Sequence, residues 1–157
     1  MMKNSFLKII FALAFFSLPF SSSIVFAGTT HNMSGWAWSS NIGWISFNCT
    51  NDSSCGTSDY GVNKNSDGTL TGFAWSSNIG WIQFGGLSGF PASGGDASVN
   101  LSTGAVTGWA KALSADGNGW DGWISLSGTS PNYGVILSGT NFTGFAWGSD
   151  VVGWIDW

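Results

Sequence analysis

Side chains that could perform acid–base chemistry are few in this chain. Its 157 residues include a single His, His31, and eight acidic residues, all Asp, with no Glu and no Arg. General acid–base catalysis needs a base with a pKa near neutrality, or two carboxylates whose pKa values are set apart. Most Asp residues lie in turn-like segments, and none recurs at a fixed position that would form a pair. We therefore predict no catalytic residue and no enzymatic activity.

The segment 116–122 holds the densest group of oxygen-bearing side chains. Asp116, Asn118 and Asp121 are separated by Gly residues and by Trp120. Calcium takes six to eight oxygen ligands, and the related segments of the chain lack these acids, so a solvated turn is favoured over a metal site. We expect no metal and no other cofactor. Because binding residues concentrate in irregular loops, Trp120, Asp116, Asn118 and Asp121 are the predicted ligand-binding residues.

Residues 1–27 have the pattern of a secretory signal peptide. Two Lys are followed by an apolar run over 9–20, and small residues precede the predicted cleavage after Ala27. This run is shorter than the ~20 residues of a membrane-spanning helix, and no later run is long enough to span a bilayer. The remainder, 28–157, suits one domain and has two Lys and eight Asp, a net charge of 2 − 8 = −6. The lack of a basic stripe excludes nucleic acid as a partner.

Export bears on two further residue types. Cys49 and Cys55 are the only Cys residues, and an exported chain with two Cys separated by polar turn residues is predicted to form a disulfide. His31 lies close to the predicted mature N-terminus, where we expect the chain to fray.

A motif of about 36 residues occurs four times and must be positioned by a repeating fold. The copies occupy 34–47, 71–84, 107–126 and 143–157, and their first Gly lies at 35, 72, 108 or 144, which gives spacings of 37, 36 and 36. A fixed period in this range predicts a repeat architecture. The third copy differs, because it has Lys111 where the others have Trp, and a longer loop before Gly122.

Within a copy, the hydrophobic pattern has a period of two. Trp36 and Trp38 face one way and Ala37 the other, while Ile45 faces away from Trp44, as in paired β-strands. A third predicted strand precedes three of the copies, over 60–63, 97–101 and 133–137. We predict an all-β fold in which tandem three-stranded antiparallel meanders form one compact domain over 28–157. Closure as a barrel, a propeller or a solenoid would each bury the exposed faces, and the sequence does not decide among them.

The 11 Trp residues admit two interpretations. Trp at matched repeat positions is what a buried ladder of side chains requires, so we predict that most Trp lie inside, with Trp120 as the best candidate for an exposed ring. Exposed Trp beside Asn and Asp is also typical of sugar-binding sites, where the apolar face of a pyranose stacks on the ring.

The strings GWAWSSNIGWISF, GFAWSSNIGWIQF and GWDGWISLSG resemble a Trp-rich tandem repeat of exported proteins from candidate-phyla bacteria of the Parcubacteria type. The resemblance covers about Ser34 to Trp157. It implies an exported, surface-located protein and carries no activity with it.

We therefore expect a secreted, non-enzymatic structural or adhesive module of the cell surface, with a surface polymer or glycan as its partner. The alternative is a lectin-like carbohydrate-binding module that uses exposed Trp with loop Asp and Asn. Ligand identity and oligomeric state stay open.

Overall fold

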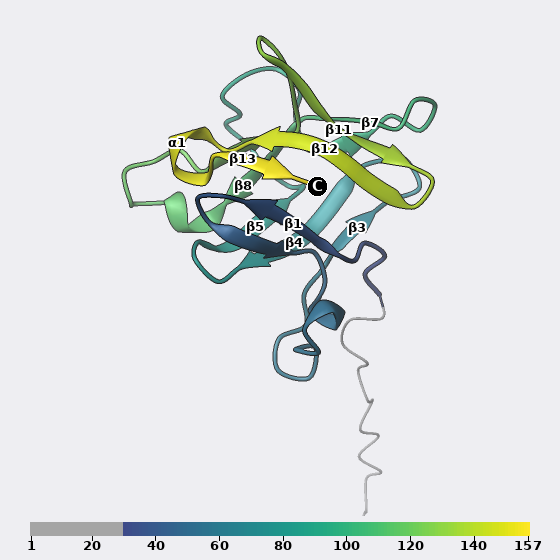
Figure 1. Cartoon of the computed structure of the whole chain (residues 1–157), viewed down its shortest axis with the longest axis vertical. Helices are drawn as coiled ribbons and strands as arrows, with labels where there is room; N and C mark the ends of the chain where they lie inside the picture. Colours follow the sequence, from purple (N-terminus) through teal and green to yellow (C-terminus); the bar gives the residue numbers. More distant parts are fainter. Residues whose placement is uncertain (1–29) are drawn as a thin grey trace, which may run out of the picture.

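The computed structural model describes residues 30–157, and the predicted signal peptide lies outside this part of the chain (Figure 1). Strands make up nearly all of its regular structure: β1 (Trp36–Ser39), β2 (Gly43–Ser46), β3 (Val62–Lys64), β4 (Leu70–Ser76), β5 (Gly80–Phe84), β6 (Ser98–Val99), β7 (Ala105–Thr107), β8 (Trp109–Ala112), β9 (Trp123–Ser125), β10 (Ser127–Thr129), β11 (Asn132–Ser138), β12 (Asn141–Trp147) and β13 (Trp154–Asp156). The short helices are the 3-10 turns η1 (Cys49–Asn51) and η2 (Leu113–Ala115), and α1 (Ser149–Val152). The all-β prediction is confirmed. Within residues 30–157, no helix is both long and apolar enough to cross a membrane.

Eight of the strands form a closed antiparallel barrel (Figure 1). They follow one another around the barrel in the order β1, β2, β4, β5, β8, β9, β12 and β13, so each of the four repeat copies supplies one hairpin. The barrel closes where the last hairpin meets the first, with Trp38 opposite Asp156 and Ser39 opposite Ile155. Closure as a barrel thus resolves the choice that the sequence left open.

The leading strands lie outside the barrel. β3 pairs with β4 and β11 with β12, which gives the predicted meander in the second and fourth copies. In the third copy the leading strand β6 pairs with β7, and β7 also pairs with β11. The first copy has no leading strand within residues 30–157. Instead, its first described residues run beside β3, where the Met33 amide donates to the Val62 carbonyl over 3.1 Å.

The barrel interior is built from one small and one larger residue per hairpin. In each hairpin an inward Ala lies directly opposite an inward Ile, and all eight side chains are at most 2% exposed. The pairs are Ala37 and Ile45, Ala74 and Ile82, Ala110 and Ile124, and Ala146 and Ile155. An eight-stranded barrel has an interior just wide enough for side chains of this size to fill it.

Larger side chains close the two ends of the barrel. At one end, Phe47, Phe84 and Trp157 pack together, with 4.5 Å between the ring centroids of Phe47 and Trp157. At the other end lie the hairpin-loop residues Ile42 and Val152, which belong to the buried core.

Most Trp residues lie on the outer face of the barrel, so the prediction that most lie inside is wrong. Nine of the 11 stand at strand positions that alternate with the inward Ala and Ile. Only Trp123 is buried, at 8% exposed. The period of two was correct, but the sequence did not show which face was the inner one. The interior is too narrow to hold the indole rings in addition to four Ile side chains.

The first Gly of each motif has a left-handed backbone in all four copies, with φ between 89° and 103°. At Gly72 and Gly144 a Cβ atom would lie 2.2 Å from a carbonyl oxygen of the leading strand. At Gly35 a Cβ atom would meet nothing within 4 Å. The empty space at Gly35 is a second sign that, within residues 30–157, no leading segment covers the first copy as it does the others.

We expect Gly144→Ala to destabilise the protein much more than Gly35→Ala. Both changes force a side chain into the left-handed region, at a cost of about 1–2 kcal/mol. Only Gly144→Ala adds a clash with backbone, which raises its total cost to about 3 kcal/mol or more. Denaturant unfolding of both variants measures the difference, and equal losses of stability would contradict the account of the first copy as uncovered.

Candidate functional site

The outward side chains of the barrel form four equivalent rows, each crossing four strands. A row begins with an aromatic residue, continues with the polar residue that follows Gly-Trp-Ile, and ends with two residues of the next hairpin. The first row is Trp36, Ser46, Trp75 and Trp81; the second is Phe73, Gln83, Lys111 and Trp123; the third is Trp109, Ser125, Trp147 and Trp154; the fourth is Phe145, Asp156, Trp38 and Trp44. Residues directly opposite one another in neighbouring strands share a face, so each row is a continuous strip of side chains.

Three of the rows are each covered by an aromatic ring from outside the barrel. Tyr60 lies 5.3 Å from Trp81, Phe90 lies 5.4 Å from Trp123, and Tyr133 lies 5.0 Å from Trp154, measured between ring centroids. We call Tyr60, Phe90 and Tyr133 the cap residues. All three precede the hairpin whose Trp they cover, in the segment where the leading strand lies.

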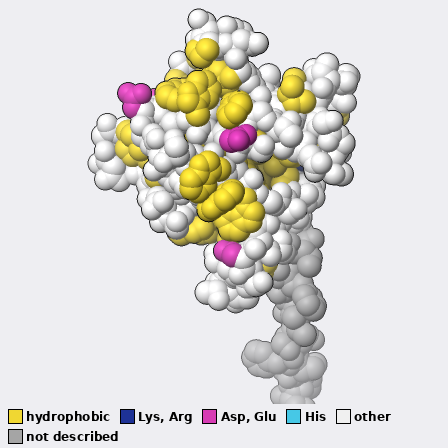
Figure 2. Space-filling view, in the orientation of Figure 1, with side chains coloured by type: hydrophobic (Ala, Val, Ile, Leu, Met, Phe, Trp, Pro, Cys, Tyr) yellow, Lys and Arg dark blue, Asp and Glu magenta, His cyan; other side chains and the backbone are white. Residues whose placement is uncertain are grey.

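The fourth row has no cap residue within residues 30–157. Its final Trp44 contacts only rings of its own hairpin, Trp36 at 6.2 Å and Trp38 at 4.8 Å between centroids. We call Phe145, Asp156, Trp38 and Trp44 the open row. In Figure 2, two groups of hydrophobic side chains appear on the face that carries β1, β12 and β13, with an acidic side chain between them.

The open row is strongly exposed for an aromatic surface. Trp44 is 57% exposed, Phe145 48% and Trp38 44%. Its neighbours Trp36 and Trp154 are 44% and 41% exposed, so they extend the aromatic surface beyond the row. Contiguous exposed apolar surface of this kind commonly marks an interaction site.

The open row differs from the other three in its polar residue, which is an acid instead of a neutral side chain. Ser46, Gln83 and Ser125 each donate a side-chain hydrogen bond to the backbone carbonyl two residues later. An ionised carboxylate has no hydrogen to donate, so Asp156 cannot make this bond. Within residues 30–157 the exposed Asp156 side chain forms neither a hydrogen bond nor an ion pair. It is therefore available to a ligand.

The disulfide predicted between Cys49 and Cys55 is confirmed, and it belongs to the loop that leads to the first cap residue. The Cys49 amide donates to the Tyr60 carbonyl over 3.0 Å, and the Tyr60 hydroxyl donates to Ser46 Oγ over 2.8 Å. These bonds hold Tyr60 over the first row with 5% of its surface exposed. The disulfide loop thus has a structural function that the sequence did not suggest.

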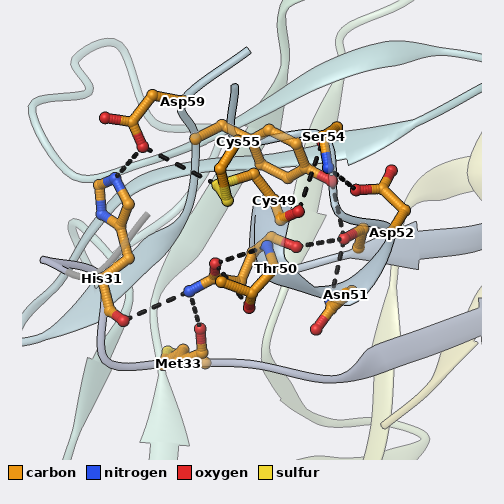
Figure 3. Close-up of a disulfide and its surroundings, with 12 residues drawn as sticks. His31, Met33, Cys49, Thr50, Asn51, Asp52, Ser54, Cys55 and Asp59 are labelled. Carbon is orange, nitrogen blue, oxygen red and sulfur yellow. Dashed lines mark hydrogen bonds and ion pairs between the residues drawn. A yellow bond between two sulfur atoms is a disulfide. The ribbon is translucent and has the colours of Figure 1, made fainter. Parts of the chain in front are cut away.

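His31 is held beside this loop, so the predicted fraying at this residue is wrong (Figure 3). Its Nδ1 atom lies 3.0 Å from Asn63 Nδ2, and its Nε2 atom lies 3.7 Å from Asp59 Oδ1. On the other side of the disulfide, Asp52 accepts a hydrogen bond from the Ser54 amide. Both acids of the loop and both ring nitrogens of His31 are thus engaged within the protein.

The predicted ligand-binding loop makes most of its polar contacts internally. Asp116 accepts a hydrogen bond from Lys111 Nζ over 2.8 Å, Asn118 donates to the Ser114 carbonyl, and Asp121 accepts from the Trp123 amide. Trp120 is half-buried and packs against the barrel core, so the expectation that it is the best candidate for an exposed ring is wrong. A ligand-binding role for these four residues stays a prediction. The structure brings them together in one loop, away from the open row.

Other surface hollows differ from the open row. Two of them, beside Trp81, also combine an acid with aromatic rings, but Asp59 faces His31 and Asp52 accepts a hydrogen bond from the Ser54 amide. A hollow of about 630 Å³ lies between Ala92–Gly94 and the β10–β11 hairpin and is lined by Trp109, Tyr133 and uncharged polar residues. Another of about 390 Å³ lies at the barrel end beside Trp157 and contains no charged residue. Among the Asp residues of the turns, Asp67 has its pKa lowered by hydrogen bonds from the side chain and backbone of Thr69, which fits a structural role.

A signal for Asp156 was present in the sequence. The residue after Gly-Trp-Ile is Ser46, Gln83, Ser125 or Asp156, so only the fourth copy has an acid there. The exposure of Trp44 was harder to predict, because it accompanies the lack of a cap residue over the first hairpin within residues 30–157. Tyr60 and Tyr133 each precede the Trp they cover by 21 residues, and the residue 21 before Trp44 is Ser23, which has no ring.

We expect Trp44→Ala to cost little stability and Trp123→Ala to cost much, although the two residues occupy the same motif position. Loss of the buried Trp123 side chain should destabilise the protein by about 3–5 kcal/mol. Loss of the exposed Trp44 removes two edge contacts, worth about 1–2 kcal/mol together. Denaturant unfolding of both variants measures this, and a Trp44 variant as unstable as the Trp123 variant would show that the open row is structural.

No protein-family model, no curated protein and no solved structure matches this chain. What the protein does is therefore inferred from the open row and from the elements that carry it.

Proposed function

We propose that this protein is an exported, non-enzymatic adhesive module of the cell surface and that the open row is its attachment surface. The observation that carries the proposal is that, within residues 30–157, no ring from outside the barrel covers Trp44, whereas each of the other three rows has a cap residue. A row of exposed aromatic rings is suited to contact with another molecule. Export is supported by the signal-peptide pattern, by the disulfide, and by the resemblance to exported Trp-rich repeat proteins.

The proposal that the protein is not an enzyme rests on its titratable groups. His31 is the only His, and both of its ring nitrogens face Asn63 or Asp59. A general base must be within reach of the proton that it abstracts, and the His31 ring is instead oriented by Asn63 at one nitrogen, with Asp59 facing the other. Turnover of a chromogenic glycoside or ester by the purified protein, lost in an Asp→Asn variant, would contradict this part of the proposal.

A second candidate function, carbohydrate binding, is favoured by the same surface. The C–H groups of a pyranose face are apolar and slightly positive, and they stack on the negative face of an aromatic ring. Trp38, Trp44 and Phe145 present exposed rings, and Asp156 lies among them as an acceptor for sugar hydroxyls. The ligand of the adhesive module would then be a surface glycan.

We expect adhesion to a glycan-bearing surface to depend on the open row. Fluorescent beads coated with the purified protein should bind a glycan array or whole cells, and the double change Trp38→Ala with Trp44→Ala should reduce binding at least tenfold, because stacking on each ring is lost.

Leu101→Ala is the matched control, since Leu101 is 61% exposed and lies outside the four rows. An unchanged signal from the double variant would remove the open row as the attachment surface. Binding to proteins but to no glycan would leave adhesion and reject the carbohydrate hypothesis.

A further inference from the structure

We propose that the open row recognises a glycan with free, protonated amino groups, and that Asp156 is the counter-ion of such a group. This inference rests on the carbohydrate binding proposed above and names the class of glycan. The rings of Trp38, Trp44 and Phe145 supply the stacking surface. The carboxylate supplies the selection.

The first step of the argument concerns Asp156 itself. Asp156 lies directly between Phe145 of β12 and Trp38 of β1. The corresponding residues of the other rows are neutral, and each donates a side-chain hydrogen bond to the backbone carbonyl two residues later. Asp156 therefore places one negative charge, without an internal partner among residues 30–157, between two exposed aromatic rings.

The second step is that the protein already holds an ammonium group in this way. In the second row, Lys111 Nζ lies 5.4 Å from the centroid of the Trp123 ring and 2.8 Å from Asp116 Oδ1. Lys111 occupies the row position that Trp38 has in the open row. A cation is thus stabilised there by a Trp ring and a carboxylate together. The open row has the ring and the carboxylate, and it lacks the cation.

The third step is charge. Residues 28–157 carry two Lys and eight Asp, so an acidic polymer would be repelled. A neutral glycan would leave the Asp156 charge uncompensated. A glycan with amino groups satisfies the stacking surface and the carboxylate at once.

The fourth step is shape. The open row crosses four strands, and three strand spacings of about 4.8 Å give it a length of roughly 14 Å. It is a strip of flat rings along the barrel surface. Consecutive sugar rings of an extended polysaccharide fit such a strip better than the flexible side chain of a single lysine does. A lysine would contact only one of the three aromatic rings of the open row.

The test compares three hexasaccharides of the same linkage: β-1,4-linked glucosamine, its N-acetylated form, and the corresponding glucose oligomer. Binding to the full purified protein is measured by calorimetry and by Trp fluorescence, at a pH where the amines are protonated. We expect the glucosamine oligomer to bind at least tenfold more tightly than the other two, because a cation–π contact and an ion pair at an exposed site add to stacking. Added salt should weaken the binding of the glucosamine oligomer and leave the binding of the other two unchanged.

Two variants locate the effect. Asp156→Asn, which keeps the size of the side chain, should abolish the preference for the glucosamine oligomer while retaining stacking. Asp150→Asn is the control, because it removes the same charge from an exposed residue of α1 that lies outside the rows. Unchanged far-UV circular dichroism of both variants shows that they fold.

The outcomes separate the two proposals. Equal binding of the amino and N-acetylated oligomers, or an unaltered preference in Asp156→Asn, would overturn the amino-glycan inference and leave carbohydrate binding in place. No binding of any of the three would overturn both. A tetralysine peptide that bound as tightly as the glucosamine oligomer would show that the row selects a protein cation and would overturn the sugar part of the inference.

Discussion

The width of the eight-stranded barrel is the constraint on which the rest of the structure depends. Each hairpin contributes one Ala and one Ile to the interior, and these pairs leave no room for indole rings. The Trp residues that alternate with them must then stand on the outer face. Nine of the 11 Trp therefore stand on the outer face, around a core that is aliphatic at its middle and is closed at one end by Phe47, Phe84 and Trp157.

Aromatic rings on the outer face leave apolar surface in contact with water unless other side chains pack over them. Three segments outside the barrel provide this packing by placing Tyr60, Phe90 or Tyr133 against the row that follows them. Tyr60 is carried by the disulfide loop, Phe90 by the segment between β5 and β6, and Tyr133 by the leading strand β11. Repetition thus explains both the regular part of the surface and the exception. The first copy has the same hairpin as the others, and within residues 30–157 no segment covers it.

The hairpins and the disulfide were predictable from the sequence. The inner face of the barrel and the open row were not, because both depend on how the barrel closes. The period of 36–37 residues and the alternation of Trp with Ala and Ile predicted four hairpins, and the spacing of Cys49 and Cys55 predicted their disulfide. Which face of a hairpin points inward depends on the radius of the closed barrel, a property of all eight strands that no single copy specifies. The same holds for the open row, since Asp156 and Trp38 are 118 residues apart (156 − 38) and become neighbours only when the last strand pairs with the first. The irregular loop at 116–121 was predicted to bind the ligand. The open row, in contrast, consists of regular motif positions over which no cap residue lies within residues 30–157.

The closing pair β1–β13 has a mechanical consequence. It is a seam with two residue pairs in register, Trp38 with Asp156 and Ser39 with Ile155, and the open row runs across it from β12 to β2. A molecule bound along the whole row would contact both β1 and β13 and would thereby stabilise the closed barrel. Binding then stabilises the fold by linkage, in proportion to the logarithm of ligand concentration. Under the proposed function, a bound ligand would therefore oppose separation of the first hairpin from the last.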